Sequence, residues 1–367
     1  QEKSVININY LIVVTTIAST EQPILLDKEL LSSYANQYKQ ELLQNILPFW
    51  LNFSKDEING GYFTCLDRTG EVYDTDKFIW LQGREVWCFS YMYTQVEAKA
   101  EWLEMAIHGA NFLEKHGRDE QGNWYFSLTA DGTPLVQPYN IFSDCFACMA
   151  FAALDKASPN SRYKQIAVDT FNNIIARKDN SKGSYNKNFP GTRNLKNFSL
   201  PMILCNLALE LEHIIGSDRV NSFIPTVIHE VMEVFYQPSS GLILENVYED
   251  GSFCNSFEGR LINPGHAIEA MWFIMDLAKR NNDTALINKA CSIVLQTLEY
   301  GWDKEHGGIF YFLDILNNPP QQLEWDQKLW WVHVEALVAL AKGYALTQND
   351  ECLQWFNKVH NYTWQHF

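Results

Sequence analysis

Residues 59–63 read Asn-Gly-Gly-Tyr-Phe, a glycine turn that leads into a short strand, and related turns recur along the chain. The glycines that mark these turns are Gly61, Gly122, Gly183, Gly241 and Gly308. Their spacings are 61, 61, 58 and 67 residues. A period of about 60 residues has room for two helices and a hairpin, and it indicates a repeat of helical pairs.

Each repeat combines one half-polar helix with one apolar helix. Residues 27–50 and 101–116 are apolar on one face, whereas residues 77–96 and 139–154 are apolar almost all round. A closed ring hides the apolar helices inside and leaves the amphipathic helices outside, which an open solenoid would not do. The sequence therefore predicts an all-α protein, an α/α toroid with short β-hairpins over one rim.

The same pattern sets the expected extent of the fold. From Asp27 onward it predicts eleven helices, six outer and five inner, the last of them over residues 351–367. A sixth turn and a sixth inner helix would follow Phe367, so we expect a barrel truncated at its C-terminus, without its last inner helix. No linker-like stretch divides residues 26–367, which we interpret as one barrel domain. Residues 1–25 are expected to be a leader of undetermined structure, too short in its apolar run to span a membrane.

The composition excludes several kinds of partner. A formal net charge of −16 argues against nucleic acid and against anionic membranes. The chain has 12 tryptophans, enough for surfaces on which a sugar ring can stack. Its eight cysteines are scattered, as buried thiols in a reducing, cytoplasmic compartment would be. Cys145 and Cys148 form a lone CxxC, which we interpret as packing rather than as a metal or redox site.

The most informative polar side chains lie on the fourth predicted inner helix, which begins after Pro264. His266 and Glu269 are at positions i and i+3 in its first turns, with Trp272 one step further along the same face. An imidazole and a carboxylate beside an indole suit proton transfer on a small polar molecule. For one helix alone, a capping histidine and a solvated glutamate would be the simpler interpretation.

Two other inner helices carry charges near their starts, interleaved with aromatic residues. The two stripes are Lys77, Trp80, Arg84, Trp87 and Tyr91 on the first inner helix, and Lys328, Trp331 and Glu335 on the fifth. Because parallel inner helices begin at one rim, we expect these groups to line a sugar-sized pocket. The structural alternative is a buried ion network that pairs Arg84 with Glu335 and Lys328 with Glu269. Histidines on or near outer helices, His360 among them, are expected to have surface roles.

At these residues the chain resembles the N-acylglucosamine 2-epimerase family, which includes the renin-binding proteins. The matching stretches are KFIWLQGREVW (77–87), LENVYEDG (244–251), NPGHAIEAMWF (263–273), GWDKEHGGIFYFLD (301–314) and QLEWDQKLWWVHVEAL (322–337). The resemblance runs from about Leu26 to the last residue and implies an (α/α)6 barrel. Cellobiose 2-epimerases and aldose-ketose isomerases belong to the same superfamily, but the QLEWDQKLWW stretch is most similar to the N-acylglucosamine branch. Disaccharide epimerases tend to carry a histidine on the third inner helix, where this chain has Met202, which would suit an N-acetyl methyl group.

The resemblance implies a sugar 2-epimerase that interconverts N-acetylglucosamine and N-acetylmannosamine through a cis-enediolate. In family terms His266 is one acid/base group, and Arg84 and Glu335 organise the enediolate. Residues that would position the sugar are Glu269, Lys328, Trp331, Trp80, Trp272 and Met202. A cation at the developing oxyanion makes a metal or redox cofactor unnecessary. The family further suggests a cytoplasmic homodimer, and regulation of some relatives by nucleotides makes ATP a candidate activator.

One departure from the family concerns the second acid/base group. Family members carry a histidine in a Phe-His-x-Pro-Arg context on the last inner helix, and this sequence ends before that helix. Inversion at C2 needs a proton donor on each face, so we expect reduced or no turnover from these 367 residues.

Two other classes of function stay open. One is a glycoside hydrolase with Glu269 and Glu335 as its carboxylates, and the other is a sugar-binding protein without catalysis.

Overall fold

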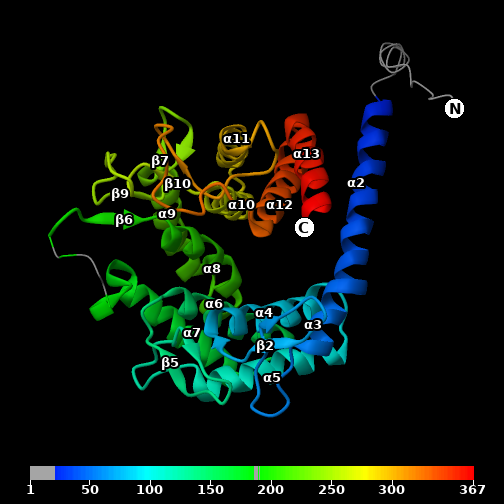
Figure 1. Ribbon diagram of the computed structural model, residues 1–367, viewed down its shortest axis with the longest axis vertical. Helices are drawn as coiled ribbons and strands as arrows, with labels where there is room; N and C mark the ends of the chain where they lie inside the picture. The colour runs from blue at the N-terminus through cyan, green and yellow to red at the C-terminus, as the bar shows by residue number, and fades with distance from the viewer. Residues whose placement is uncertain (1–20, 186–188, 190) are drawn as a thin grey trace.

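The computed structural model describes residues 21–185, 189 and 191–367. In this part of the chain, outer and inner helices alternate around a ring (Figure 1). The outer helices are α2 (Glu21–Glu41) with its continuation through the π-turn η1 (Leu42–Ile46) into α3 (Leu47–Phe53), α5 (Ala100–His116), α7 (Ser161–Arg177), α9 (Ser217–His229) with its π-helical end η4 (Glu230–Val234), α11 (Thr284–Gly301) and α13 (Asp350–His366). The inner helices are α4 (Ile79–Gln95), α6 (Phe142–Ala157), α8 (Ser199–Ile215), α10 (Pro264–Arg280) and α12 (Trp330–Thr347). For the described residues, the predicted six outer and five inner helices are confirmed.

The inner helices pack on one another in chain order, from α4 through α6, α8 and α10 to α12. Each inner helix also packs on the outer helix that follows it, and one continuous cluster of buried side chains fills the space between the layers. Within the described residues, α12 and α4 do not pack on each other in the same way. The ends of the outer layer do meet, because α2 stands beside α13 (Figure 1).

The glycine turns that define the repeat are real turns of the backbone. The five landmark glycines have φ values between +51° and +83°, a region that glycine adopts without the steric cost of a Cβ. Three of the turns are closed by single antiparallel bridges, such as the one between Lys55 and Tyr62, and the turn at Gly241 joins β7 to β8. Two short 3₁₀ turns, η2 (Lys178–Asn180) and η3 (Gly183–Tyr185), follow α7.

Short antiparallel strands connect the loops of successive repeats. β3 pairs with β4, β6 with β9 and β10 with β11, while β1–β2, β4–β5 and β7–β8 pair within one loop region. The strands are β1 (Cys65–Leu66), β2 (Val72–Asp74), β3 (Lys77–Phe78), β4 (Ser127–Leu128), β5 (Pro134–Val136), β6 (Leu195–Asn197), β7 (Tyr236–Gln237), β8 (Leu242–Ile243), β9 (Asn246–Tyr248), β10 (Leu261–Ile262) and β11 (Leu313–Asp314). Each loop is thereby held against its neighbour at the ends of the helices.

Lys77 corrects the predicted stripe on the first inner helix. It lies in strand β3, and α4 begins only at Ile79. Its side chain is fully buried, with Nζ 2.7 Å from Asp56 Oδ2, 2.6 Å from Gly60 O and 2.8 Å from Ala130 O. Because three oxygens satisfy this ammonium group, it joins two neighbouring loops. The prediction that Lys77 begins the aromatic stripe is wrong.

Two further expectations changed at the ends of the chain. The first described helix begins at Glu21, within the expected leader and before the predicted Asp27, while residues 1–20 lie outside the described residues. His360 is buried, with 6% of its surface exposed, because α2 covers α13 at this point. The surface role predicted for His360 is therefore wrong.

All eight cysteines are free thiols, and six of them are buried. Cys145 and Cys148 lie in the core of α6, as the packing interpretation predicts. Among the described residues, no helix combines the length and the apolar character needed to cross a bilayer.

Candidate functional site

The start of α10 places His266 by local capping. Asn263 is the N-cap residue, and its side-chain Oδ1 accepts a hydrogen bond from the backbone N–H of His266 at 3.1 Å. Pro264 occupies the first helical position, where its fixed φ suits the helix and its missing N–H costs nothing. Gly265 packs against α12 so closely that an added Cβ would lie 2.6 Å from the Trp331 ring. The first turn of α10 is therefore fixed against α12.

Glu245 is the direct partner of the His266 imidazole. Both carboxylate oxygens of Glu245 lie 3.1 Å from His266 Nδ1. The backbone of Glu245 is held on two sides, because its N–H donates to Leu261 O and its carbonyl accepts from Phe198 N–H. Glu245 is 6% exposed, whereas 26% of the His266 side chain remains exposed. The buried carboxylate fixes the Nδ1 side of the ring, and no described residue bonds to Nε2, which can therefore face a ligand.

This arrangement sets the protonation of His266. Burial on its own lowers the pKa of an imidazole, but the charge and hydrogen bond of Glu245, together with the charge of Glu269, outweigh it. The net result is a pKa of His266 above its ordinary value. An imidazole with these neighbours can take up a proton and return it close to neutral pH.

Arg84 on α4 faces the same group from the first repeat. Its guanidinium lies over the rings of Phe146, at 4.3 Å from the centroid, and of Trp80, at 5.5 Å. The charges of Glu269 and Glu335 act on it, yet within the described chain it makes no ion pair or hydrogen bond with either carboxylate. Arg84 is also exposed to solvent, although protein atoms surround it on most sides. Among the described residues it is a positioned cation whose guanidinium makes no hydrogen bond to the protein.

Glu335 on α12 is held by α10. Trp272 Nε1 donates a hydrogen bond to Glu335 Oε2 at 2.7 Å. The face of the Trp272 ring carries Lys342 Nζ at 4.7 Å from the centroid, and Lys342 is paired with Asp276 at 2.5 Å. The ion pair between Lys342 and Asp276 holds the Trp272 indole in place. The orientation of Glu335 therefore depends on side chains from both α10 and α12.

The two carboxylates of the site resist ionisation. Burial raises the pKa of Glu269, and the charges of His266 and Arg84 offset only part of that effect. Burial, reinforced by the negative charge of Glu269, raises the pKa of Glu335 to about 7, although Trp272 and Arg84 act in the opposite direction. Near neutral pH Glu335 can therefore both donate and accept a proton.

The structure brings most of the predicted site residues together. His266 and Trp331 have ring centroids 5.7 Å apart, which adds Trp331 to the group already formed by Arg84, Trp80, Glu269, Trp272 and Glu335. The ion network of Lys328 with Glu269 is not formed in the described chain. Lys328 Nζ instead lies 3.1 Å from Asp303 Oδ2 and 3.7 Å from the centroid of the Phe310 ring.

Met202 lies in the core, and Glu245 joins the site without a role assigned from the sequence. Met202 on α8 is 5% exposed and belongs to the hydrophobic core, and its assignment to an N-acetyl group stays a prediction. Glu245 had no assigned role, although it lies within the LENVYEDG stretch (244–251). The signal that could have found it was a carboxylate that directly follows a run of three apolar residues, Leu242, Ile243 and Leu244.

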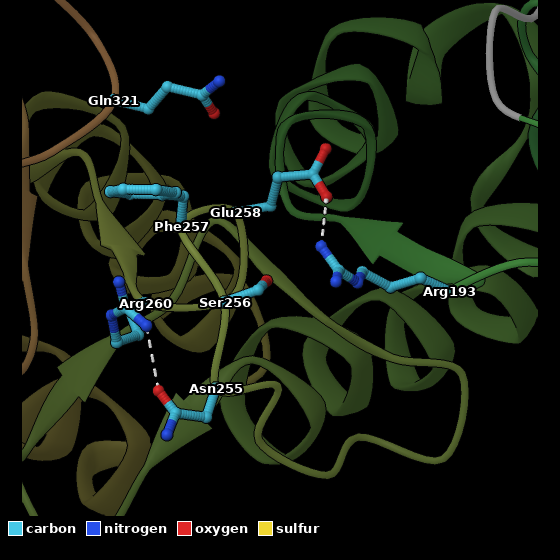
Figure 2. A pocket seen from close by; sticks show the side chains of 7 residues that line it. All are labelled: Arg193, Asn255, Ser256, Phe257, Glu258, Arg260 and Gln321. Carbon is cyan, nitrogen blue, oxygen red and sulfur yellow. Dashed lines mark hydrogen bonds and ion pairs between the residues drawn. The ribbon is translucent and has the colours of Figure 1, made fainter.

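Two surface cavities lie elsewhere on the molecule. One of about 490 Å³ is lined by residues of the 255–260 loop with Arg193 and Gln321, and Figure 2 shows Arg193 facing Glu258 and Arg260 facing Asn255 across it. Another of about 900 Å³ lies between the start of α6, the segment that follows α7, the start of α8 and strand β6. Neither cavity is lined by a predicted site residue. Among the described residues, no group of three or more histidine, cysteine or acidic side chains is placed to hold a metal ion.

Comparisons with known proteins identify what the chain is similar to. Residues 61–367 match the family model described as N-acylglucosamine 2-epimerase (GlcNAc 2-epimerase). The N-acylglucosamine 2-epimerase of Bos taurus is 36% identical over 352 residues, which cover 93% of this chain and 82% of that protein. The cellobiose 2-epimerase of Dictyoglomus turgidum is 25% identical over 330 residues, covering 86% of this chain and 82% of that protein. The solved structure of the cellobiose 2-epimerase from Bacillus thermoamylovorans shares the fold, with a TM-score of 0.78 at 21% identity, over 91% of this chain and 88% of that one.

Proposed function

The chain belongs to the N-acylglucosamine 2-epimerase family, and on this premise we propose that it interconverts N-acetylglucosamine and N-acetylmannosamine by moving the proton on C2. It is an isomerase of the epimerase class. The identity of 36% to an N-acylglucosamine 2-epimerase, against 25% to a cellobiose 2-epimerase, favours the N-acetylated monosaccharide. The observation that carries the mechanism is the pairing of His266 with Glu245 opposite the unpaired guanidinium of Arg84.

His266 is the proposed acid/base group. The open-chain sugar has a carbonyl at C1, which makes the C2 proton acidic enough for an imidazole to remove. Nε2 of neutral His266 takes this proton, while Glu245 at Nδ1 stabilises the imidazolium that forms. The same imidazolium can return a proton only to the face from which it was taken, so inversion at C2 needs a second proton donor on the opposite face of the enediolate. Glu245 lies between strands β8 and β9, and Asn263 caps the helix that carries His266. The imidazole ring therefore keeps its orientation while it accepts and donates a proton.

Arg84 is the proposed stabiliser of the enediolate. When the C2 proton leaves, negative charge develops on the sugar oxygens at C1 and C2. The Arg84 guanidinium is held over Phe146 and Trp80 and can donate to these oxygens without first breaking an ion pair. Glu335, with its pKa of about 7, is suited to carry a proton between them. A positioned cation beside two carboxylates thus balances the charge of the intermediate.

The remaining residues are proposed to position the sugar. Trp80, Trp272 and Trp331 supply ring faces for the C–H surface of the sugar, and Glu269 supplies a hydrogen-bond acceptor for a hydroxyl. Lys328 would act indirectly, because its pairing with Asp303 anchors the approach to α12. The N-acetyl contact of Met202, a homodimer, activation by ATP and a cytoplasmic location stay predictions.

Incubation of the protein with N-acetylmannosamine in deuterium oxide, followed by proton NMR, tests this proposal. Exchange at C2 reports on proton removal, and formation of N-acetylglucosamine reports on return of the proton to the opposite face. We expect the sugar to gain deuterium at C2 while all its other bonds stay intact. A hydrolase would instead cleave a bond and add water. Loss of general acid/base catalysis in His266→Ala should slow the exchange by a factor on the order of 10²–10⁴.

The matched control is His306→Ala, because His306 lies in an exposed turn with 77% of its side chain accessible. This variant should exchange C2 as fast as the unaltered protein. Equal exchange in the His266→Ala variant would remove His266 from the mechanism. Exchange with cellobiose but not with N-acetylmannosamine would retain the chemistry and change the substrate.

A further inference from the structure

Two cysteines on neighbouring outer helices face each other. Cys291 on α11 and Cys352 on α13 have Sγ atoms 3.3 Å apart, although 61 positions separate them in sequence. A disulfide bond is about 2.05 Å long, so modest rotation of both side chains would bring the sulfurs to bonding distance. We propose that this pair is a site of reversible oxidation, where a hydroperoxide forms a disulfide that links α11 to α13.

The surroundings of the pair leave room for two sulfur atoms. Gly343 of α12 packs against both of them, and a Cβ at this position would lie 3.1 Å from Cys352 Sγ and 3.2 Å from Cys291 Sγ. Thr347 Oγ1 lies 3.9 Å from Cys291 Sγ. Three helices therefore build this site, and a glycine provides the space in which the sulfurs meet.

Cys291 is the more reactive of the two thiols. The hydrogen bond from Cys352, with a smaller contribution from Thr347, lowers the pKa of Cys291 to about 7 against the opposing effects of burial and of the Glu351 charge. Cys291 Sγ also lies against the first turn of α13, where Cys352 is the third residue and the positive end of the helix dipole favours negative charge. A thiolate is the nucleophile toward peroxides, so oxidation should begin at Cys291.

The reaction balances with the peroxide as the two-electron oxidant. The Cys291 thiolate attacks one peroxide oxygen, the O–O bond breaks, and the sulfur becomes a sulfenic acid while the other oxygen leaves as water or an alcohol. The sulfur of Cys352 then attacks the sulfenic sulfur and an S–S bond forms. The sulfenic hydroxyl takes the proton of the Cys352 thiol and leaves as water. A dithiol reductant reverses the change by thiol–disulfide exchange.

Access to the pair requires only a local opening. Cys291 and Cys352 are 3% and 1% exposed, but the turn that leads into α13, at Gln348 and Asn349, is exposed. Helix ends open more readily than helix centres, and a hydroperoxide such as hydrogen peroxide is close to water in size. The bond would fasten α13, the helix on which α2 packs, to α11. It should therefore raise the melting temperature by constraining the unfolded chain.

The test treats the full chain with hydrogen peroxide at neutral pH, blocks the remaining thiols and maps disulfides by mass spectrometry without reduction. We expect a cross-linked peptide that contains Cys291 and Cys352 before any other cysteine is consumed. The melting temperature should rise by several degrees and fall again on addition of a dithiol. In Cys352→Ser, Cys291 should accumulate as a sulfenic acid that a dimedone probe labels.

Two controls separate the pair from ordinary thiol oxidation. Cys145 and Cys148 are buried to a similar degree on α6 without contact between their sulfurs, so they should stay reduced. Gly343→Ala keeps both thiols but pushes the sulfurs apart, and it should slow the cross-link at least several-fold. Free Cys291 and Cys352 after other cysteines have reacted would overturn the proposal. The readout does not involve sugar chemistry. The outcome for the cysteine pair is therefore independent of the outcome for the proposed epimerase activity.

Discussion

The imidazole of His266 depends on a carboxylate 21 positions earlier in the chain. Glu245 raises the pKa of His266 against the opposing effect of burial. If neutral His266 is the base, activity should rise with pH as the imidazolium loses its proton. The acid limb of the pH profile therefore reports on this pair of residues.

In the variant Glu245→Gln, the pKa of His266 should fall, so the acid limb of kcat/KM should move to lower pH. At the pH optimum the rate should also fall, because the imidazolium that forms during proton transfer loses its charged partner. A charge-assisted hydrogen bond is worth about 1.5–3 kcal/mol, which corresponds to a loss of about 10- to 150-fold in rate. The measurement is kcat/KM across pH.

Glu249→Gln is the matched control, because it removes the same charge from an exposed position in the same loop region. It should leave both the rate and the acid limb unchanged. A shift of the same size in both variants would mean that general electrostatics, and not the contact with Nδ1, sets the pKa of His266.

The pairing of Glu245 with His266 shows what sequence patterns can and cannot reveal about this site. His266, Glu269 and Trp272 follow the helical period, so their common face was predictable. Glu245 lies between two short strands, where no period links it to α10, and its position results from pairing between distant loops. The assignment of Lys77 failed for a related reason. The stripe at helical spacing begins two residues before α4 does, and Lys77 lies in strand β3.

At the level of secondary-structure elements, Lys77 joins the loop at Gly60 to the loop at Ala130. Its Nζ also pairs with Asp56 Oδ2, which is as fully buried as the lysine. In Lys77→Met, this carboxylate and two carbonyls would lose their partner. Removing one member of a buried ion pair typically costs about 3–5 kcal/mol. We expect a loss of this size in the free energy of unfolding, measured in urea.

Lys55→Met tests the same chemical change at the surface, where Lys55 and Glu57 form an ion pair with 36% and 72% of their side chains exposed. Exposed pairs contribute at most about 1 kcal/mol, so this variant should unfold close to the unaltered protein. Equal costs in the two variants would show that burial of Lys77 has no special role.

The repeat of elements was the most predictable feature, because each turn glycine adopts a positive φ that the sequence marks directly. The alternation of amphipathic and apolar helices also followed from composition alone. The contact between α2 and α13 could not be predicted in this way. It joins the two ends of the described chain, and the sequence pattern of neither helix identifies the other as its packing partner.

On the scale of the whole molecule, α2 and α13 meet through two tyrosines. Tyr34 Oη donates to Asn357 Oδ1 at 2.9 Å, and Tyr38 Oη lies 2.9 Å from His360 Nδ1. Burial lowers the pKa of His360, and burial with the neighbouring Tyr34 raises the pKa of Tyr38 to about 12. A neutral Tyr38 hydroxyl therefore donates to a neutral imidazole.

A lowered pKa of His360 makes this contact sensitive to acid. An imidazole in the detached helix takes up a proton near its ordinary pKa of about 6.5, whereas the docked imidazole resists it. The contact is thus fully stable above that pH and weakens as pH falls toward the lowered pKa of the docked ring. Hydrogen exchange of residues 29–41, corrected for intrinsic rates, should accelerate several-fold between pH 7 and pH 5.

The variant His360→Gln lacks the titrating group and should remove this pH dependence while the exchange of α6 stays constant in both proteins. Acceleration of the same size in the variant would assign the acid effect to carboxylates elsewhere in the ring.

The proposed reaction centre is spread over the first, fourth and fifth repeats, with Arg84 from α4, His266 from α10 and Glu335 from α12. No contiguous fragment shorter than most of the chain contains all three. The proposed catalysis needs all three residues in place, so we expect an isolated half of the protein to be inactive even when its helices form. The rate of turnover would then report on assembly of the ring. It would reveal a packing defect far from the sugar before that defect is large enough to unfold the molecule.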